Sequence, residues 1–131
     1  MYYYHIWLVL RESLEESDCG SLHLKSSSIQ SYINKNLNCI PINCINYVNY
    51  SLILQCSGGA NHRGDDHANM IKSLNMISEL LPGSYGLIYW MDDEIPGRNN
   101  FDGFNVIVLA RGCLTERYDP FLSPIAPTIE N

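Results

Sequence analysis

Positive charge is scarce in this sequence. Lysine and arginine together number 8 against 14 aspartates and glutamates, so the formal net charge is −6, and the basic residues never cluster. Binding to phosphates requires clustered cations, so this balance argues against direct binding of nucleic acid and against a nucleotide pocket built on basic side chains. It favours a basic partner, or it serves solubility alone.

The sequence also lacks the signatures of membrane passage and of disulfide or zinc frameworks. Its first apolar run, Tyr2 to Leu10, has no basic segment before it and is too short to span a bilayer. We therefore expect a cytoplasmic protein with no membrane partner. The 5 cysteines contain no CxxC spacing, so we expect free thiols, with Cys39, Cys44 and Cys56 buried in apolar strands.

Common catalytic and cofactor fingerprints are missing as well. There is no GxSxG nucleophile motif, no P-loop and no GxGxxG dinucleotide motif. Neither Cys19 nor Cys113 has a specific histidine partner that would make it a nucleophile. The sequence therefore indicates no enzyme of these classes and no bound cofactor.

The pattern of hydrophobic residues predicts one α+β domain over residues 1–131. Hydrophobic residues make up 46% of the chain, which is typical of a globular domain of this length. Apolar residues recur with the period of a strand in some segments and of a helix in others. These patterns predict strands over residues 2–10, 39–45, 50–57, 84–91 and 104–110, and helices over residues 28–37 and from Asp65 or Asp66 to Leu81.

The predicted order βαββαββ gives a mostly antiparallel sheet with two helices on one face, a variant of the ferredoxin-like fold. The first helix is placed by Ser27 and Gln30, which have the spacing of a capping box, and a start nearer Ser21 is the alternative. Pro41 cannot donate a hydrogen bond, so the strand over residues 39–45 is expected at a sheet edge.

Both alternating sets of side chains in the segment from Tyr2 to Leu10 are apolar. We therefore expect a central strand that needs cover on both faces. The tail over residues 115–131 contains three prolines and is expected to be extended and docked across the body of the domain. Its apolar residues could supply part of that cover as anchors: Phe121, Leu122, Ile125 and Ile129.

The segment over residues 61–67 is the most enzyme-like part of the chain. Two histidines and two carboxylates within it could bind a metal or share a proton: His62, Asp65, Asp66 and His67. The histidines lie five apart across a glycine, which is not the helical HExxH geometry. We favour a polar loop with a helix cap and keep a small metal-assisted hydrolase as the alternative.

Two acidic segments are candidate binding surfaces. The first contains Glu12, Glu15, Glu16 and Asp18, and the second contains Asp92, Asp93 and Glu94. Each could be a solvated segment, and the second could hold Mg²⁺, although adjacent strand residues point to opposite faces. Of the two tryptophans, Trp90 lies beside the second segment and is expected to be the more exposed at an interface.

Short strings along nearly the whole chain resemble a known family. They are the aromatic first strand ending in LRES, GANHRG from Gly59, SYGLIYWMDDE from Ser84, and FNVIVLARGCLTERYDPFLSPIAP from Phe104. These strings resemble bacterial immunity proteins of polymorphic-toxin and contact-dependent growth inhibition systems, of the type called immunity protein 7. In that resemblance the tail carries a cysteine where this chain has Ile125, and it ends acidic where this chain ends Glu130-Asn131.

The resemblance implies an α+β toxin inhibitor that binds and neutralises the C-terminal domain of a cognate toxin in the cytosol. It implies no enzyme activity and no cofactor. Many toxins of this kind are nucleases, which tend to be basic and would suit an acidic inhibitor. The candidate toxin contacts are then the acidic segments from Glu12 to Asp18 and from Asp92 to Glu94, with Trp90. A structural module that self-associates through the edge strand near Pro41 remains a third interpretation.

Overall fold

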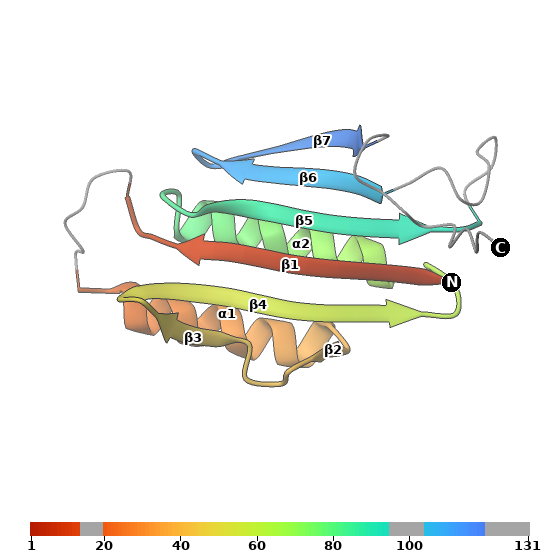
Figure 1. Ribbon diagram of the computed structural model, residues 1–131. Helices are drawn as coiled ribbons and strands as arrows, with labels where there is room; N and C mark the ends of the chain where they lie inside the picture. The colour runs from red at the N-terminus through yellow and green to blue at the C-terminus, as the bar shows by residue number, and fades with distance from the viewer. Residues whose placement is uncertain (14–19, 95–103, 120–131) are drawn as a thin grey trace, which may run out of the picture.

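The protein combines one antiparallel sheet with two helices (Figure 1). The computed structural model describes residues 1–13, 20–94 and 104–119. This confirms the predicted α+β class with a mostly antiparallel sheet. The elements are β1 (Tyr2–Leu10), α1 (Leu22–Asn36), β2 (Cys39–Ile40), β3 (Ile45–Val48), β4 (Ser51–Ala60), α2 (Asp66–Leu80), β5 (Tyr85–Asp92), β6 (Phe104–Ala110) and β7 (Cys113–Asp119).

Strand β1 lies in the middle of the sheet. The strand order is β2-β4-β1-β5-β6-β7, with β3 also paired to β4, and each pairing is antiparallel. Helix α1 leads from β1 to β2 across β4, and α2 leads from β4 to β5 across β1. This is the split βαβ arrangement. The close pairing of β1 with β5 depends on Gly86, because a Cβ there would lie 2.1 Å from the backbone oxygen of Trp7.

The element order differs from the predicted βαββαββ in two places. The predicted strand over residues 39–45 is two short strands, β2 and β3, separated by residues 41–44. Residues 113–119 form strand β7, where the sequence predicted the start of an extended tail at residue 115. Residues 120–131, with the four anchors predicted for the tail, lie outside the described residues.

Two tight turns close the hairpins that contain β3 and β7. Asn49 and Tyr50 have φ values of 49° and 65°, and Arg111 and Gly112 have φ values of 52° and 73°. Positive φ at both central residues is the mark of a type I′ turn, which closes a two-residue hairpin. The first turn joins β3 to β4 and the second joins β6 to β7. Tyr50 and Arg111 are unusual in such turns, so the sequence signal is weak.

Helix α1 begins at Leu22, which agrees with the alternative start near Ser21 and lies six residues before the favoured start at Ser28. Ser27 and Gln30 therefore lie inside the helix, and the predicted capping box is wrong. The Gln30 side chain instead reaches the segment between β2 and β3. Its Oε1 accepts hydrogen bonds from the backbone N–H groups of Cys44 (3.1 Å) and Ile45 (3.2 Å), and its Nε2 donates to the Ile42 carbonyl (2.9 Å).

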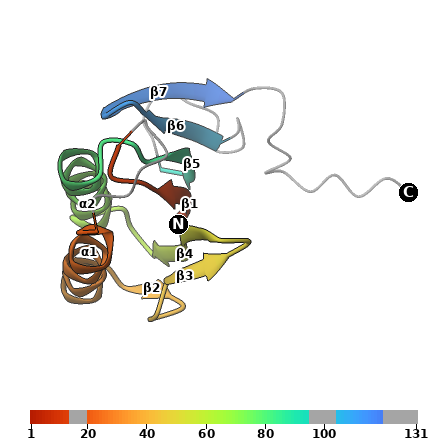
Figure 2. The same ribbon diagram turned by 90° about the vertical axis from the view of Figure 1, so that its left-hand side faces the viewer.

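The core lies between the helices and one face of the sheet. Figure 2 shows both helices on the same side of the sheet. Alternate residues of β1 point to that side and are between 0% and 4% exposed: Tyr2, Tyr4, Ile6 and Leu8. They pack with Ile29 and Ile33 of α1 and with Met70, Leu74 and Ile77 of α2. Full burial of such a side chain contributes about 1.5–3 kcal/mol.

Three cysteines lie at the edge of this core. Cys44 and Cys56 are buried and Cys39 is half-buried, and all three are free thiols, as predicted. Hydrogen bonds with Cys39 and Cys44, together with burial, raise the pKa of Cys56, which keeps it a neutral thiol. Within the described residues, no helix combines the length and the apolar character that crossing a membrane requires.

Candidate functional site

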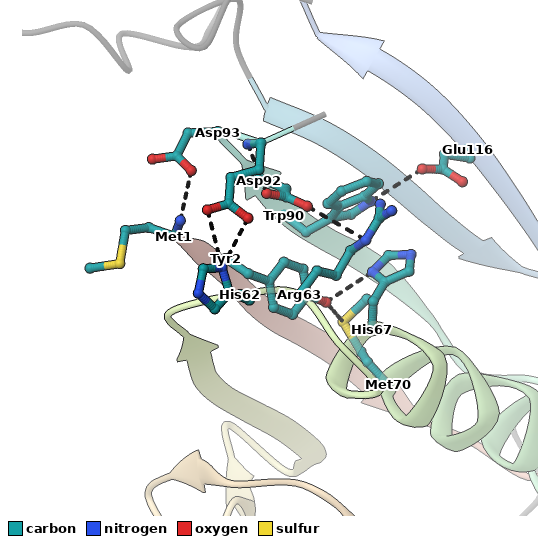
Figure 3. Close-up of polar contacts among 11 residues, drawn as sticks. Met1, Tyr2, His62, Arg63, His67, Met70, Trp90, Asp92, Asp93 and Glu116 are labelled. Atoms are coloured by element: carbon teal, nitrogen blue, oxygen red, sulfur yellow. Dashed lines mark hydrogen bonds and ion pairs between the residues drawn. The ribbon is translucent and has the colours of Figure 1, made fainter. Parts of the chain in front are cut away.

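One end of the sheet gathers most of the polar residues that the sequence singled out (Figure 3). Strand β1 begins there, β5 ends there, and the loop from β4 into α2 crosses the same end. The register places Tyr2 opposite Ala60 of β4 on one side and opposite Asp92 of β5 on the other. The 61–67 segment and the Asp92 to Glu94 segment, which are far apart in sequence, therefore meet. We call this region the acidic end.

Each carboxylate of the second acidic segment has a cationic or histidine partner at the acidic end. Asp92 lies 3.5 Å from Arg63 Nε, and its side chain is only 5% exposed. Glu94 contacts His62 Nδ1 at 3.0 Å, and Asp93 accepts a hydrogen bond of 2.6 Å from the amino group of Met1. This amino group has its pKa raised, first by the hydrogen bond with Asp93. Because the Asp92 side chain is buried, its contact with Arg63 holds the end of β5 against the loop, whereas the exposed contacts of Asp93 and Glu94 contribute little to stability.

Negative charge nevertheless exceeds positive charge at the acidic end. Among the described residues there, the positive groups are Arg63, the amino terminus and Arg117, which follows Glu116 in β7. The carboxylates are more numerous: Asp65, Asp66, Asp92, Asp93, Glu94 and Glu116. The side chains of Asp93 and Glu94 are 34% and 52% exposed, so they are accessible to a partner. The excess of carboxylates creates a negative surface potential that attracts cationic groups.

Trp90 lies beneath this surface and is only 5% exposed. The prediction that Trp90 is the more exposed tryptophan is wrong, because Trp7 is 41% exposed. The Trp90 indole donates a hydrogen bond to Glu116 of β7 at 3.2 Å and lies under the guanidinium of Arg63, 5.9 Å from the ring centroid. Trp90 therefore supports Arg63 and Glu116 and presents little surface of its own.

His67 and Tyr2 complete the buried side of the cluster. The ring centroids of His67 and Trp90 are 4.4 Å apart, and the Tyr2 hydroxyl lies 2.9 Å from His67 Nδ1. Burial, and then the nearby Arg63, lowers the pKa of His67, which favours the neutral imidazole. Burial, and then the nearby Asp66, raises the pKa of Tyr2, so its hydroxyl stays protonated. The hydroxyl can therefore donate a hydrogen bond to the imidazole of His67.

The residues of the alternative metal site have different partners. His62 faces Glu94, whereas His67 packs against Tyr2 and Trp90. Asp65 is the residue before α2 and its carbonyl accepts a hydrogen bond from Asn69 N at 2.9 Å, while Asp66 lies in the first helical turn. The described residues contain no group of three or more histidine, cysteine or carboxylate ligands that could hold a metal ion. Asp65 has the predicted N-cap position at the end of the loop, but its side chain makes no capping hydrogen bond.

The first acidic segment has a different character where it is described. The Glu12 side chain is 4% exposed, accepts a hydrogen bond from the Ser21 hydroxyl and lies 3.8 Å from Lys25 Nζ. These contacts tie the end of β1 to the start of α1. Glu15, Glu16 and Asp18 lie outside the described residues.

Sequence reasoning missed two members of the acidic end. Glu116 was assigned to the tail, although the alternation of Leu114, Glu116 and Tyr118 after the Arg111-Gly112 turn could have indicated a strand. The role of Arg63 could not be predicted from its own segment, because its partners Asp92 and Trp90 come from β5.

The fold and the site define a small α+β protein with a charged end and a buried aromatic cluster beneath it. A model of the Immunity protein 7 family matches residues 1–131, so the chain belongs to that family. Membership makes it an immunity protein, which neutralises a toxin. Comparison with curated proteins gave no match, and comparison with solved structures gave none either.

Proposed function

We propose that this immunity protein captures a basic, nuclease-type toxin domain in the cytosol and neutralises it by binding, without catalysing a reaction. The observation that carries the proposal is the excess of carboxylates at the acidic end, with Asp93 and Glu94 accessible to a partner. A basic domain would be drawn to this surface, because complementary charge raises association rates by orders of magnitude. The net charge of −6 over the whole chain acts in the same direction.

The geometry also limits which carboxylates can serve as contacts. Asp92 is buried against Arg63, and Glu12 is buried against Ser21 and Lys25. Replacing either one would remove a structural contact and disturb the fold. Asp93 and Glu94 are the residues at which a change of charge tests binding directly, because both are accessible and lie in the turn after β5.

The test measures how fast the purified cognate toxin domain associates with the protein at two salt concentrations. At roughly 50 mM salt the double variant Asp93→Asn, Glu94→Gln should associate about tenfold more slowly than the unchanged protein. At roughly 500 mM salt, dissolved ions screen the attraction between exposed charges that are more than a few ångströms apart. The association rates of the double variant and the unchanged protein should then be nearly equal. The matched control is Glu79→Gln, which also removes one exposed carboxylate but lies near the far end of α2.

Equal association rates at both salt concentrations would remove electrostatic capture as the mechanism. A control variant that slows association as much as the double variant would instead assign the effect to net charge and not to the acidic end.

A further inference from the structure

Both helices lie on one side of the sheet (Figure 2), and the opposite face carries large apolar side chains that remain exposed. We call it the open face. The exposed fractions are 47% for Tyr3, 41% for Trp7, 45% for Tyr85 and 38% for Leu87. Trp7 is directly opposite Leu87 in the register of β1 and β5, so these side chains form one patch. Contiguous apolar patches on a soluble protein are typical of interaction sites.

The centre of the open face is free of charge. Strand alternation assigns Tyr3, His5, Trp7 and Val9 of β1 to this face, and their register partners in β4 and β5 are uncharged as well. In the described part of the face, the nearest charged side chains in register are Asp93, two residues after Met91 at the acidic end, and Arg117 of β7, opposite Val106. Depletion of charge with enrichment of tyrosine and tryptophan is the composition of the core of a protein–protein interface.

A hollow of about 440 Å³ opens on this face. Its walls include Tyr3, Tyr89 and Phe104, and its floor includes His5, whose Nδ1 lies 2.8 Å from the Ser57 hydroxyl. Tyr89 and Phe104 meet edge to face with ring centroids 6.1 Å apart, which holds that wall in place. The volume falls within the range of about 300–1,000 Å³ that encloses small ligands, so it can accept a large side chain from a partner.

The open face continues into the acidic end. A second hollow of about 480 Å³ runs beside Tyr3 and includes Met1 and Asn61 in its lining. Met1 contacts Asp93, and Asn61 precedes His62, the partner of Glu94. An apolar centre therefore borders directly on an acidic rim. A partner that fits this surface has apolar side chains at its own centre and basic side chains at one border.

We propose that the open face is the apolar centre of the toxin-binding surface, with Trp7 as an anchor, and that the acidic end is its charged rim. This inference rests on the proposed function and specifies which surface of the protein contacts the toxin. The two parts act on different rates: the rim accelerates association, and the desolvated centre slows dissociation. Anchors of this kind contribute most of the affinity of an interface.

The experiment measures association and dissociation rates with an inactivated form of the cognate toxin domain. Trp7→Thr and Leu87→Thr should each accelerate dissociation about thirtyfold or more and change association less than about threefold. Threonine retains strand propensity, and both side chains are already partly exposed, so the fold should survive. The matched control is Leu24→Ala, which removes a 71% exposed leucine from α1 on the other side of the sheet.

A second measurement needs no change in sequence. The chain has 2 tryptophans, so 5-fluorotryptophan labelling gives two ¹⁹F resonances. On addition of the toxin domain the resonance of exposed Trp7 should shift strongly, and that of Trp90, which is 5% exposed, should shift less.

The outcomes separate this inference from the proposed function. If the unchanged protein does not bind the toxin domain, the proposed function falls and this inference falls with it. Binding by the unchanged protein, with normal dissociation of both variants and an unmoved Trp7 resonance, would overturn the inference alone. A Trp7 resonance that shifts with protein concentration but not with toxin would indicate a second copy of this chain on the open face, which would also overturn it.

Discussion

The two faces of the central sheet carry the same kinds of side chain in different environments. On the helix side of β1, Tyr4 and Leu8 are 4% and 0% exposed, whereas Tyr3 and Trp7 on the open face are 47% and 41% exposed. These residues alternate along a single strand. Apolar content alone therefore does not distinguish a side chain that stabilises the fold from one that remains available to a partner.

This difference changes the interpretation of the doubly apolar first strand. Both alternating sets predicted a strand covered on both faces, but the described helices cover one face only (Figure 2). Exposure of aromatic side chains to water is unfavourable, so a partner that covers them gains binding free energy. In an inhibitor, unsatisfied apolar surface on a rigid sheet is a ready binding surface.

The largest contrast should appear when neighbouring residues of β1 are shortened. Leu8 is fully buried opposite Leu54 and Gly86, so Leu8→Ala should lower the free energy of unfolding by about 2–5 kcal/mol. Trp7→Thr, one residue away on the open face, should cost less than about 1 kcal/mol. Urea denaturation of both variants measures the difference. Equal losses would mean that the open face is covered in the folded protein and that the two faces are not distinct.

A smaller contrast is expected between two glutamines. Gln30 accepts hydrogen bonds from Cys44 N and Ile45 N, so Gln30→Leu leaves two backbone donors without that acceptor. We expect a loss of about 1–3 kcal/mol. Gln55 is exposed on the open face opposite Trp7, and Gln55→Leu should change stability by no more than about 0.5 kcal/mol.

Thermal or urea unfolding of the two glutamine variants is sufficient for this comparison. If Gln30→Leu unfolds like the unchanged protein, water replaces the side chain at Cys44 and Ile45, and α1 does not fix the segment between β2 and β3.

Long periodic segments were predicted well from the sequence. Strands β1 and β6 have the predicted bounds, and α2 begins at Asp66 as the helix signals indicated. Hydrophobic period is a strong signal over such lengths. The hairpin of β6 and β7 was missed, and the turn between β3 and β4 was placed too early, because Arg111 and Tyr50 have positive φ, which is typical of glycine or asparagine. A tyrosine or an arginine at such a position gives no local sequence signal for the turn.

The candidate site was predicted in pieces and not as a unit. The 61–67 segment and the Asp92 to Glu94 segment were each singled out, but their meeting depends on β1 pairing with both β4 and β5. The exposure of the two tryptophans could not be predicted from the sequence either. A tryptophan beside an acidic turn gives no sign that Arg63 and His67 will cover it, and the exposure of Trp7 follows only from the position of the helices.

The smallest effect expected is a change in how stability depends on pH. It arises from His67, which lies in α2 on the helix side of the sheet. Burial and Arg63 lower the pKa of His67 from its ordinary value of 6.5 in the folded protein. The unfolded chain therefore binds a proton more readily than the folded chain does. The contribution of His67 to stability is fully present above 6.5 and is lost as the pH falls from there toward the lower pKa of the folded state.

His67→Gln removes this titration and keeps a polar side chain beside the Tyr2 hydroxyl. Relative to the unchanged protein, the variant should lose less stability between about pH 7.5 and pH 5.5, as measured by urea unfolding at several pH values. Other groups titrate equally in both proteins, so the difference between the two curves isolates His67. A difference that does not change with pH would mean that His67 takes up its proton as readily in the folded protein as in the unfolded chain. In that case the aromatic cluster under the acidic end would be open to water, and Trp90 and Tyr2 would not form the rigid support on which Asp93 and Glu94 are presented.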